Sequence, residues 1–151
     1  MSVVQSFAVN ACGCSIISDA ANLYWTAHYL KFSKHGLYRS NLDSSPMGHA
    51  VCGVVGMGLG DKHAVAIVSD AAMLMQSEVG TAVLYGSKAI WLVMSGSRYD
   101  FELLALAVGC DGCTVMDEEG LRKALTGALA RDGPTVINVI VDSPRVAPSK
   151  A

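Results

Sequence analysis

Two short apolar segments, with a helix-like stretch between them, constrain the fold more than any other feature of the chain. Residues 64–68 and 89–94 are each too short for a helix and too apolar for a strand with one wet face. Between them, residues 73–85 carry apolar side chains at helical spacing, and Gly86 follows as a C-terminal stop. A strand, a crossover helix and a parallel strand form a right-handed βαβ unit. This segment therefore predicts a parallel sheet that is covered on both faces.

The rest of the chain repeats this alternation, with a glycine-rich segment at 48–59 whose helix would need close backbone packing. Ser18-Asp19 is expected to cap the helix that follows it, and Asp117 is expected to do the same near the C-terminus. Further strands are predicted at 14–17, 113–116 and 135–141, further helices at 3–11, 20–29, 101–108 and 117–131, a surface connection at 31–45 and a frayed tail at 143–151. We therefore predict an α/β fold, a doubly wound parallel sheet with helices on both faces, as a single domain over residues 1–151.

The charge and hydrophobicity of the chain narrow the class of protein. A net charge of −2 and a charged fraction of 16% argue against nucleic acid or an anionic membrane as partner. The N-terminus lacks a basic region before an apolar one, and no apolar run is long enough to span a membrane, so a cytoplasmic protein is expected. Because 52% of the residues are hydrophobic, we expect another chain to cover part of the surface.

The five cysteines leave three hypotheses open. Cys12, Cys14, Cys110 and Cys113 have the paired spacing of a four-thiolate zinc site. Cys110 and Cys113 alone have the spacing of a redox pair. The third hypothesis is that all are reduced core residues, because free cysteine packs as a small hydrophobe.

The polar residues that follow the two central strands mark the expected ligand site. Ligands of parallel sheets bind at the carboxyl ends of the strands, here Ser69-Asp70-Ala71 and Ser95-Gly96-Ser97. Asp70 is either a metal ligand or the N-cap of the next helix. From the residues alone, Met47 in the sequence Pro-Met-Gly is interpreted as a core residue.

The order of several motifs carries a family resemblance. The motifs are the segment from Asp19 through Trp25 to Phe32 with Ser45-Pro46-Met47-Gly48 after it, Ser69-Asp70-Ala71 with EVGTAVLYG after it, VMSGSRY at 93–99, and the close from AVGCDGCTVMDEEGLRKAL to DGPTVINVIVD. Together they resemble the pyrophosphate-binding (PP) domain of thiamine-diphosphate enzymes of the acetolactate synthase, benzoylformate decarboxylase and sulfopyruvate decarboxylase type. The resemblance extends over the whole chain.

The resemblance implies a cofactor, thiamine diphosphate, held with Mg²⁺. By resemblance the cofactor would contact Ser45, Met47, Gly48, Ser69, Asp70, Ala71, Ala72 and Ser97, and the metal would be held by Asp70 with Ser95 or Ser97. The chain departs from the family where these groups bind. Ser69 and Ala71 replace both glycines of the Gly-Asp-Gly motif, Gly96 stands at the second metal-ligand position, and the lid that usually follows is absent. Mg²⁺ requires oxygen ligands, and Gly96 has no side-chain oxygen.

The resemblance also implies a partner. In this family a pyrimidine-binding (PYR) domain supplies the Glu that activates the cofactor, so no catalytic residue is expected in this chain. The first hypothesis is therefore the PP subunit of a split 2-oxo acid decarboxylase or carboligase, a homo- or hetero-oligomer that is active only with a chain that carries the PYR domain. The alternative is a cofactor-free pseudo-enzyme subunit with a structural or regulatory role, because a fold does not imply an activity.

Overall fold

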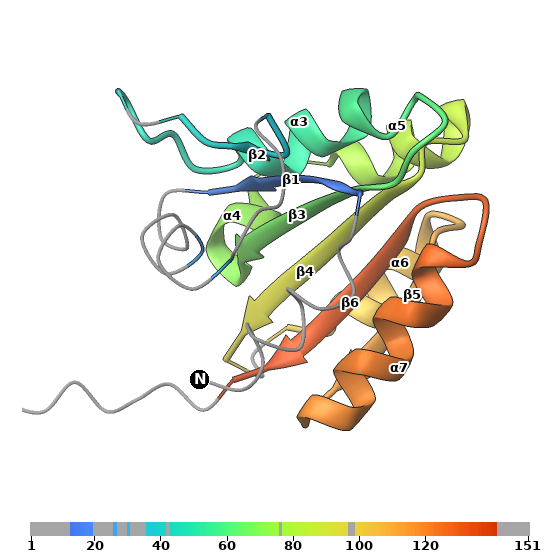
Figure 1. Cartoon of the computed structure of the whole chain (residues 1–151). Coiled ribbons are helices and arrows are strands. Elements are labelled where there is room, and N and C mark those ends of the chain that lie inside the picture. Colours follow the sequence, from blue (N-terminus) through green and yellow to red (C-terminus); the bar gives the residue numbers. More distant parts are fainter. Residues whose placement is uncertain are drawn as a thin grey trace, which may run out of the picture.

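The computed structural model describes residues 13–19, 26, 30, 36–41, 43–75, 77–96 and 99–141, and these build one parallel sheet flanked by helices (Figure 1). The six strands are β1 (Ser15–Ser18), β2 (Tyr38–Arg39), β3 (Ala64–Ser69), β4 (Ala89–Ser95), β5 (Asp111–Val115) and β6 (Thr135–Ile140). Their order across the sheet is β2-β1-β3-β4-β6-β5, and every pair is parallel. The predicted doubly wound α/β fold is confirmed.

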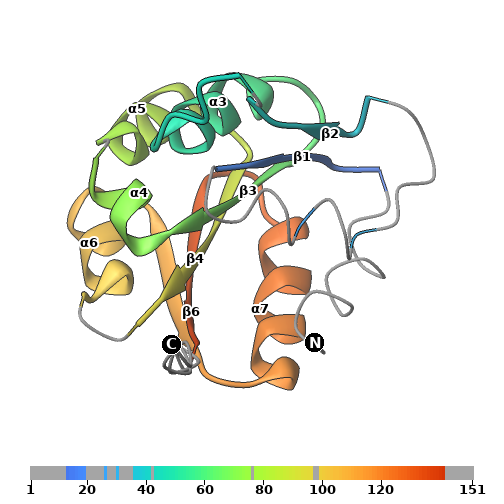
Figure 2. The same cartoon turned by 90° about the vertical axis from the view of Figure 1, so that its left-hand side faces the viewer.

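The helices divide between the two faces of the sheet. They are α3 (His49–Met57), α4 (Asp70–Leu74), α5 (Glu78–Tyr85), α6 (Phe101–Ala107) and α7 (Glu118–Leu129). Side chains of α3, α4, α5 and α6 share one buried cluster with Ala66, Trp91 and Val136, whereas α7 packs into a second cluster with residues such as Ile90 and Ile137. Figure 2 shows α7 on the opposite side of the sheet from α4, α5 and α6. The sheet is therefore covered on both faces, as its apolar strands require.

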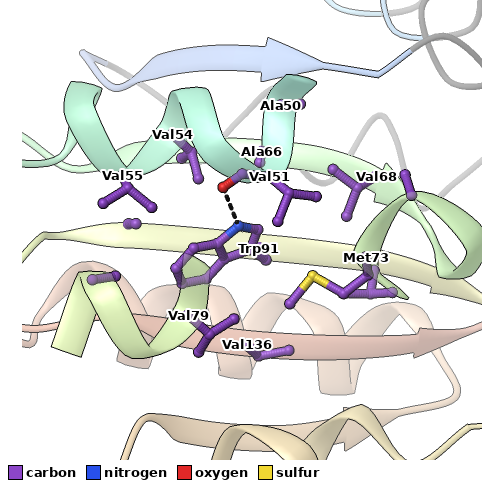
Figure 3. Close-up of a cluster of buried hydrophobic side chains, with 14 of the residues drawn as sticks. Ala50, Val51, Val54, Val55, Ala66, Val68, Met73, Val79, Trp91 and Val136 are labelled. Atoms are coloured by element: carbon purple, nitrogen blue, oxygen red, sulfur yellow. Dashed lines mark hydrogen bonds between the residues drawn. The ribbon is translucent and has the colours of Figure 1, made fainter. Parts of the chain in front are cut away.

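The first cluster is organised around Trp91 in the middle of β4 (Figure 3). Its ring has no exposed surface, and its Nε1–H donates a hydrogen bond to the Val51 carbonyl oxygen of α3 at 3.1 Å. The end of α3 also packs closely against the start of β4. A Cβ at Gly58, which follows α3, would lie 2.8 Å from the backbone nitrogen of Ala89, the first residue of β4. The prediction that the glycine-rich segment forms a helix with close packing is confirmed, and its neighbour is the sheet.

Two elements differ from the sequence prediction. The single helix predicted over 73–85 is two helices, because α4 begins directly at the end of β3 and α5 begins anew after Ser77. Gly86 ends α5 as predicted, with a left-handed φ of 62°. The connection predicted at 31–45 contains β2, a two-residue edge strand that is too short to produce a sequence pattern.

Other predicted segments lie wholly or mostly outside the described residues. They are the helix at 3–11, the helix at 20–29, of which Thr26 is described and is helical, and the tail at 143–151. In the part of the chain that the structure describes, no helix has the length and apolar character needed to cross a membrane.

Candidate functional site

The carboxyl edge of the sheet has a switch in chain direction between β1 and β3. From β1 the chain continues to β2 on one side, and from β3 it continues to β4 on the other. Open parallel sheets bind ligands in the crevice at such a switch point. The two predicted site segments at strand ends lie at this edge, after β3 and β4, and the end of β1 lies at the same edge.

Asp19, which directly follows β1, joins the end of this strand to β3 and to the N-terminus of α3 through hydrogen bonds. Its amide donates to the Ile67 carbonyl oxygen of β3 at 3.2 Å, and its carboxylate is almost fully buried. Oδ2 accepts from the Gly48 amide at 2.8 Å, and Oδ1 accepts from the Ala50 amide at 3.4 Å. Asp19 therefore satisfies the N-terminus of α3, whereas the sequence prediction gave it to the helix directly after it.

The contacts of Asp19 place the Met47-Gly48 turn beside the ends of β1 and β3. Gly48 has a φ of 86°, a left-handed conformation that glycine adopts without strain. Met47 is 44% exposed, so the hypothesis that it is a core residue is wrong. Ser45, also predicted to contact the cofactor, lies before this turn with a φ of 41°, and its Oγ donates to the Asn41 carbonyl oxygen at 3.3 Å.

At the end of β3, Ser69 rather than Asp70 is the N-cap of α4. Ser69 Oγ accepts from the Ala72 amide at 3.2 Å. Asp70 is the first helical residue, is partly exposed, and its Oδ1 accepts from the adjacent Ala71 amide at 2.7 Å. The hypothesis that Asp70 is the N-cap of the next helix is therefore wrong, because Ser69 holds that position. Of the other predicted cofactor contacts, Ala71 is exposed and the Ala72 side chain is buried.

The end of β4 offers fewer ligand atoms than the end of β3. Ser95 is fully buried, and its Oγ has no hydrogen-bond partner. Gly96 has no side chain, and a Cβ placed there would meet nothing within 4 Å. Ser97, predicted to contact both cofactor and metal, lies outside the described residues.

These residues do not make a complete Mg²⁺ site. Mg²⁺ favours carboxylate oxygens in octahedral geometry. At this edge Asp70 supplies one carboxylate and Ser95 one buried neutral hydroxyl. Across the described ranges, no three His, Cys, Asp or Glu side chains gather in a way that could hold a metal ion. The donor set therefore lacks the second strong ligand that a resident Mg²⁺ requires.

Cys12 lies outside the described residues, and the described cysteines form no site of the kinds considered from the sequence. Cys14 precedes β1 whereas Cys110 and Cys113 flank the start of β5, and three strands separate β1 from β5. At about 4.8 Å per strand spacing, one zinc ion cannot bind both groups. Burial raises the pKa of Cys110 to about 12 and also raises the pKa of Cys113, opposite to an activated redox pair. Both are reduced residues packed beside the sheet.

Cys52 on α3 is the described thiol nearest the switch point, and it is not activated either. Burial raises its pKa, and the carboxylates of Glu78 and Asp19 add to that effect. The negative charge of these carboxylates disfavours a thiolate. None of Cys52, Cys110 and Cys113 is therefore an activated nucleophile.

Comparisons with known proteins agree with this geometry. Residues 94–139 match the family model described as the C-terminal TPP binding domain of thiamine pyrophosphate enzymes. A Mycobacterium tuberculosis protein assigned as an acetolactate synthase large subunit, IlvB2, is 26% identical, and the match covers 91% of this chain and 29% of IlvB2. The chain thus spans less than a third of the length of that relative.

Solved structures show the same fold. A Mycobacterium smegmatis protein assigned as a thiamin diphosphate-dependent enzyme superposes with a TM-score of 0.79 at 20% identity, over 93% of this chain and 31% of the other. The thiamine diphosphate-dependent 4-hydroxybenzoylformate decarboxylase of Rhodococcus jostii RHA1 gives 0.80 at 19% identity, over 93% and 32%. The resemblance predicted from the motifs is confirmed: residues 94–139 are similar to the C-terminal TPP binding domain of thiamine pyrophosphate enzymes, and nearly the whole chain is similar to the IlvB2 protein.

Proposed function

We propose that the chain is the PP domain of a thiamine-diphosphate-dependent enzyme that decarboxylates or joins 2-oxo acids, and that a second chain completes its active site. Two similar proteins support the substrate class, one assigned as an acetolactate synthase subunit and one named a 4-hydroxybenzoylformate decarboxylase. The chain corresponds to about a third of each relative, which is the size of one domain. We propose a cytoplasmic complex, in line with the sequence expectation.

The position of Asp70 carries this proposal. It lies at the end of the central strand β3, it is partly exposed, and Ser69 relieves it of the capping role. Its Oδ1 accepts a hydrogen bond from the Ala71 amide. The carboxylate at the switch point is thus available for a ligand, as it is expected to be in a cofactor site.

The chain would position the cofactor rather than supply a catalytic acid or base. The Met47-Gly48 turn, fixed by the buried Asp19 carboxylate, would contact the bound cofactor beside β3. Thiamine diphosphate supplies the chemistry when bound, because it acts as an electron sink for bonds next to a carbonyl. A Glu from the second chain would activate the cofactor.

The metal ligands that this chain would supply are incomplete without the cofactor. Asp70 with Ser95 or Ser97 would offer one carboxylate and neutral hydroxyls to Mg²⁺. The remaining ligands would come from the diphosphate oxygens, a common arrangement for Mg²⁺ in proteins.

Exposed apolar side chains support an association with another chain. Leu84 and Tyr85 on α5 are 78% and 66% exposed, and Leu103 and Leu106 on α6 are 64% and 53% exposed. All four lie on helices that cover the same face of the sheet. We predict self- or hetero-association through this face, and Leu84→Asp with Leu103→Asp should weaken it. Sedimentation at micromolar concentration would count against the prediction if the wild-type chain alone, and mixed with its partner, remained monomeric.

A second candidate is a cofactor-free subunit with a role in assembly. The absence of a ligand atom at Gly96 favours it, together with the replacement of both motif glycines by Ser69 and Ala71. The amides of Ala71 and Ala72, which would face a diphosphate at this turn, already donate to side chains of the chain itself.

Reconstitution separates the two candidates. The purified chain is mixed with a stand-alone PYR-domain chain, thiamine diphosphate, Mg²⁺ and a panel of 2-oxo acids, and carbon dioxide release is measured. We expect no activity from this chain alone and activity from the mixture that Asp70→Ala abolishes. Activity of the isolated chain would contradict the need for a partner, and a stable but inactive complex would favour the assembly role.

A further inference from the structure

The end of β4 has open space at the position where a second metal ligand would stand. Gly96 follows Ser95 directly, its φ lies outside the left-handed region, and a Cβ added to it would meet no atom within 4 Å. Asp70 follows the neighbouring strand, whose last register pair is Ser69 with Met94. Because adjacent strands are about 4.8 Å apart, short side chains at 70 and 96 can reach one ion.

The described atoms now at this place are poor ligands for a hard cation. Of the two residues that directly follow β3 and β4, Asp70 and Gly96, Asp70 carries the carboxylate, and Asp100 further along the chain is engaged as the cap of α6. Ser69 Oγ is engaged as the cap of α4, and Ser95 Oγ is buried and neutral. We infer that this chain by itself holds no resident divalent cation at the ends of β3 and β4, and that Gly96 is the position that decides this.

The metal site concerned is that of the proposed function, so the inference rests on that proposal for its location. It adds the source of the cation. A divalent ion reaches this crevice with the diphosphate or with ligands from the second chain, because Asp70 alone does not retain it. Metal affinity then belongs to the assembled complex and is absent from the free chain.

The test titrates MnCl2 into the folded chain without cofactor and follows binding by calorimetry. The wild type should show no saturable binding up to millimolar concentrations. Gly96→Asp supplies the missing carboxylate and should tighten Mn²⁺ binding by at least about tenfold, since affinity for hard cations rises with the charge of the ligand set. Adding Asp70→Ala to Gly96→Asp should abolish that gain. Gly60→Asp is the matched control, an exposed glycine with equal space before β3, at the opposite edge of the sheet.

Two results would overturn the inference. One is saturable Mn²⁺ binding by the wild type that Asp70→Ala removes. The other is a Gly96→Asp variant that binds no better than Gly60→Asp. Thermal unfolding with and without Mn²⁺ reports the same binding as a shift in melting temperature and verifies that each variant is folded. If Gly96→Asp does not fold, Gly96→Asn supplies the ligand oxygen without a second negative charge and must show the Asp70-dependent gain.

Since no cofactor is present in this titration, its result stands apart from the proposed function. If the reconstituted enzyme shows no activity, the Mn²⁺ titration can still be interpreted. If the wild type binds Mn²⁺, the inference is overturned but the proposed function is not.

Discussion

The middle and the end of β4 differ in how completely their side chains are satisfied. In the middle, Trp91 and Val93 have no exposed surface, and the Trp91 indole N–H has a partner on α3. At the end, Ser95 is buried without a partner, and Gly96 faces open space. Over the five residues from Trp91 to Ser95, the surroundings of β4 thus change from a closely packed core to an incomplete ligand site.

This difference teaches that the middle of β4 is fully packed, whereas its end offers few ligand atoms. The core that positions the carboxyl edge is complete, including the contacts that fix the Met47-Gly48 turn. The substitutions relative to the family's motifs, at Ser69, Ala71 and Gly96, fall on the edge itself. A fold can be kept while the function on it changes, and the proposed function therefore assigns the missing groups to a second chain.

Trp91→Ala should produce the largest loss of stability in the molecule. It empties the centre of the main cluster and leaves the Val51 carbonyl oxygen without its donor. We expect the free energy of unfolding to fall by about 3–5 kcal/mol, the usual range for a buried Trp. Urea denaturation measures it, with Trp91→Phe as the milder control. A loss below about 1 kcal/mol would break the contrast between core and edge.

Asp19→Ala should have a smaller effect, because it removes a buried cap rather than a core side chain. The Gly48 and Ala50 amides would lose their acceptor at the N-terminus of α3. We expect a loss of about 1–3 kcal/mol in urea denaturation. Asp19→Asn retains one acceptor oxygen and should lose less. An Asp19→Ala variant as stable as the wild type would show that the turn does not depend on this carboxylate.

The buried thiol of Cys110 should make stability depend on pH in the alkaline range. Burial, and then the charge of Asp111, raises its pKa from 9.0 to about 12 in the folded chain. The unfolded thiol loses its proton near pH 9 while the folded thiol keeps it, so the free energy of unfolding should fall between pH 9 and about 12. Below pH 9 this thiol contributes no dependence. Cys110→Ala should show a shallower alkaline decline, and an unchanged slope would contradict the assignment.

Local patterns predicted the strands that matter most for the fold. The apolar runs at 64–68 and 89–94 correspond to β3 and β4, and Asp117 caps α7 with a hydrogen bond from the Gly120 amide. Local patterns failed where tertiary contacts decide. β2 exists because it pairs with β1, and its two residues carry no periodicity.

The site was predictable in its location and less so in its contacts. Strand ends followed by polar residues located the edge, and the family's motif order located Met47 and Asp70. The role of Asp19 was not predictable from local sequence, because its acceptor oxygens meet amides 29 and 31 residues away. Ser69 was assigned to the cofactor alone, although serine before a helix is a strong N-cap signal.

Asp70→Ala should have the smallest effect on stability and the most informative effect on function. The side chain is partly exposed and makes a local hydrogen bond to its neighbour, so the free energy of unfolding should change by no more than about 0.5 kcal/mol.

The most direct test of the central claim is a calorimetric titration of thiamine diphosphate with Mg²⁺ into wild type and Asp70→Ala, each mixed with the second chain. We predict binding by the wild-type mixture and none by the Asp70→Ala mixture, with both variants equally stable. Equal binding by the two mixtures, or none by the wild type, would contradict the assignment of Asp70 as the residue that keeps this edge a cofactor site.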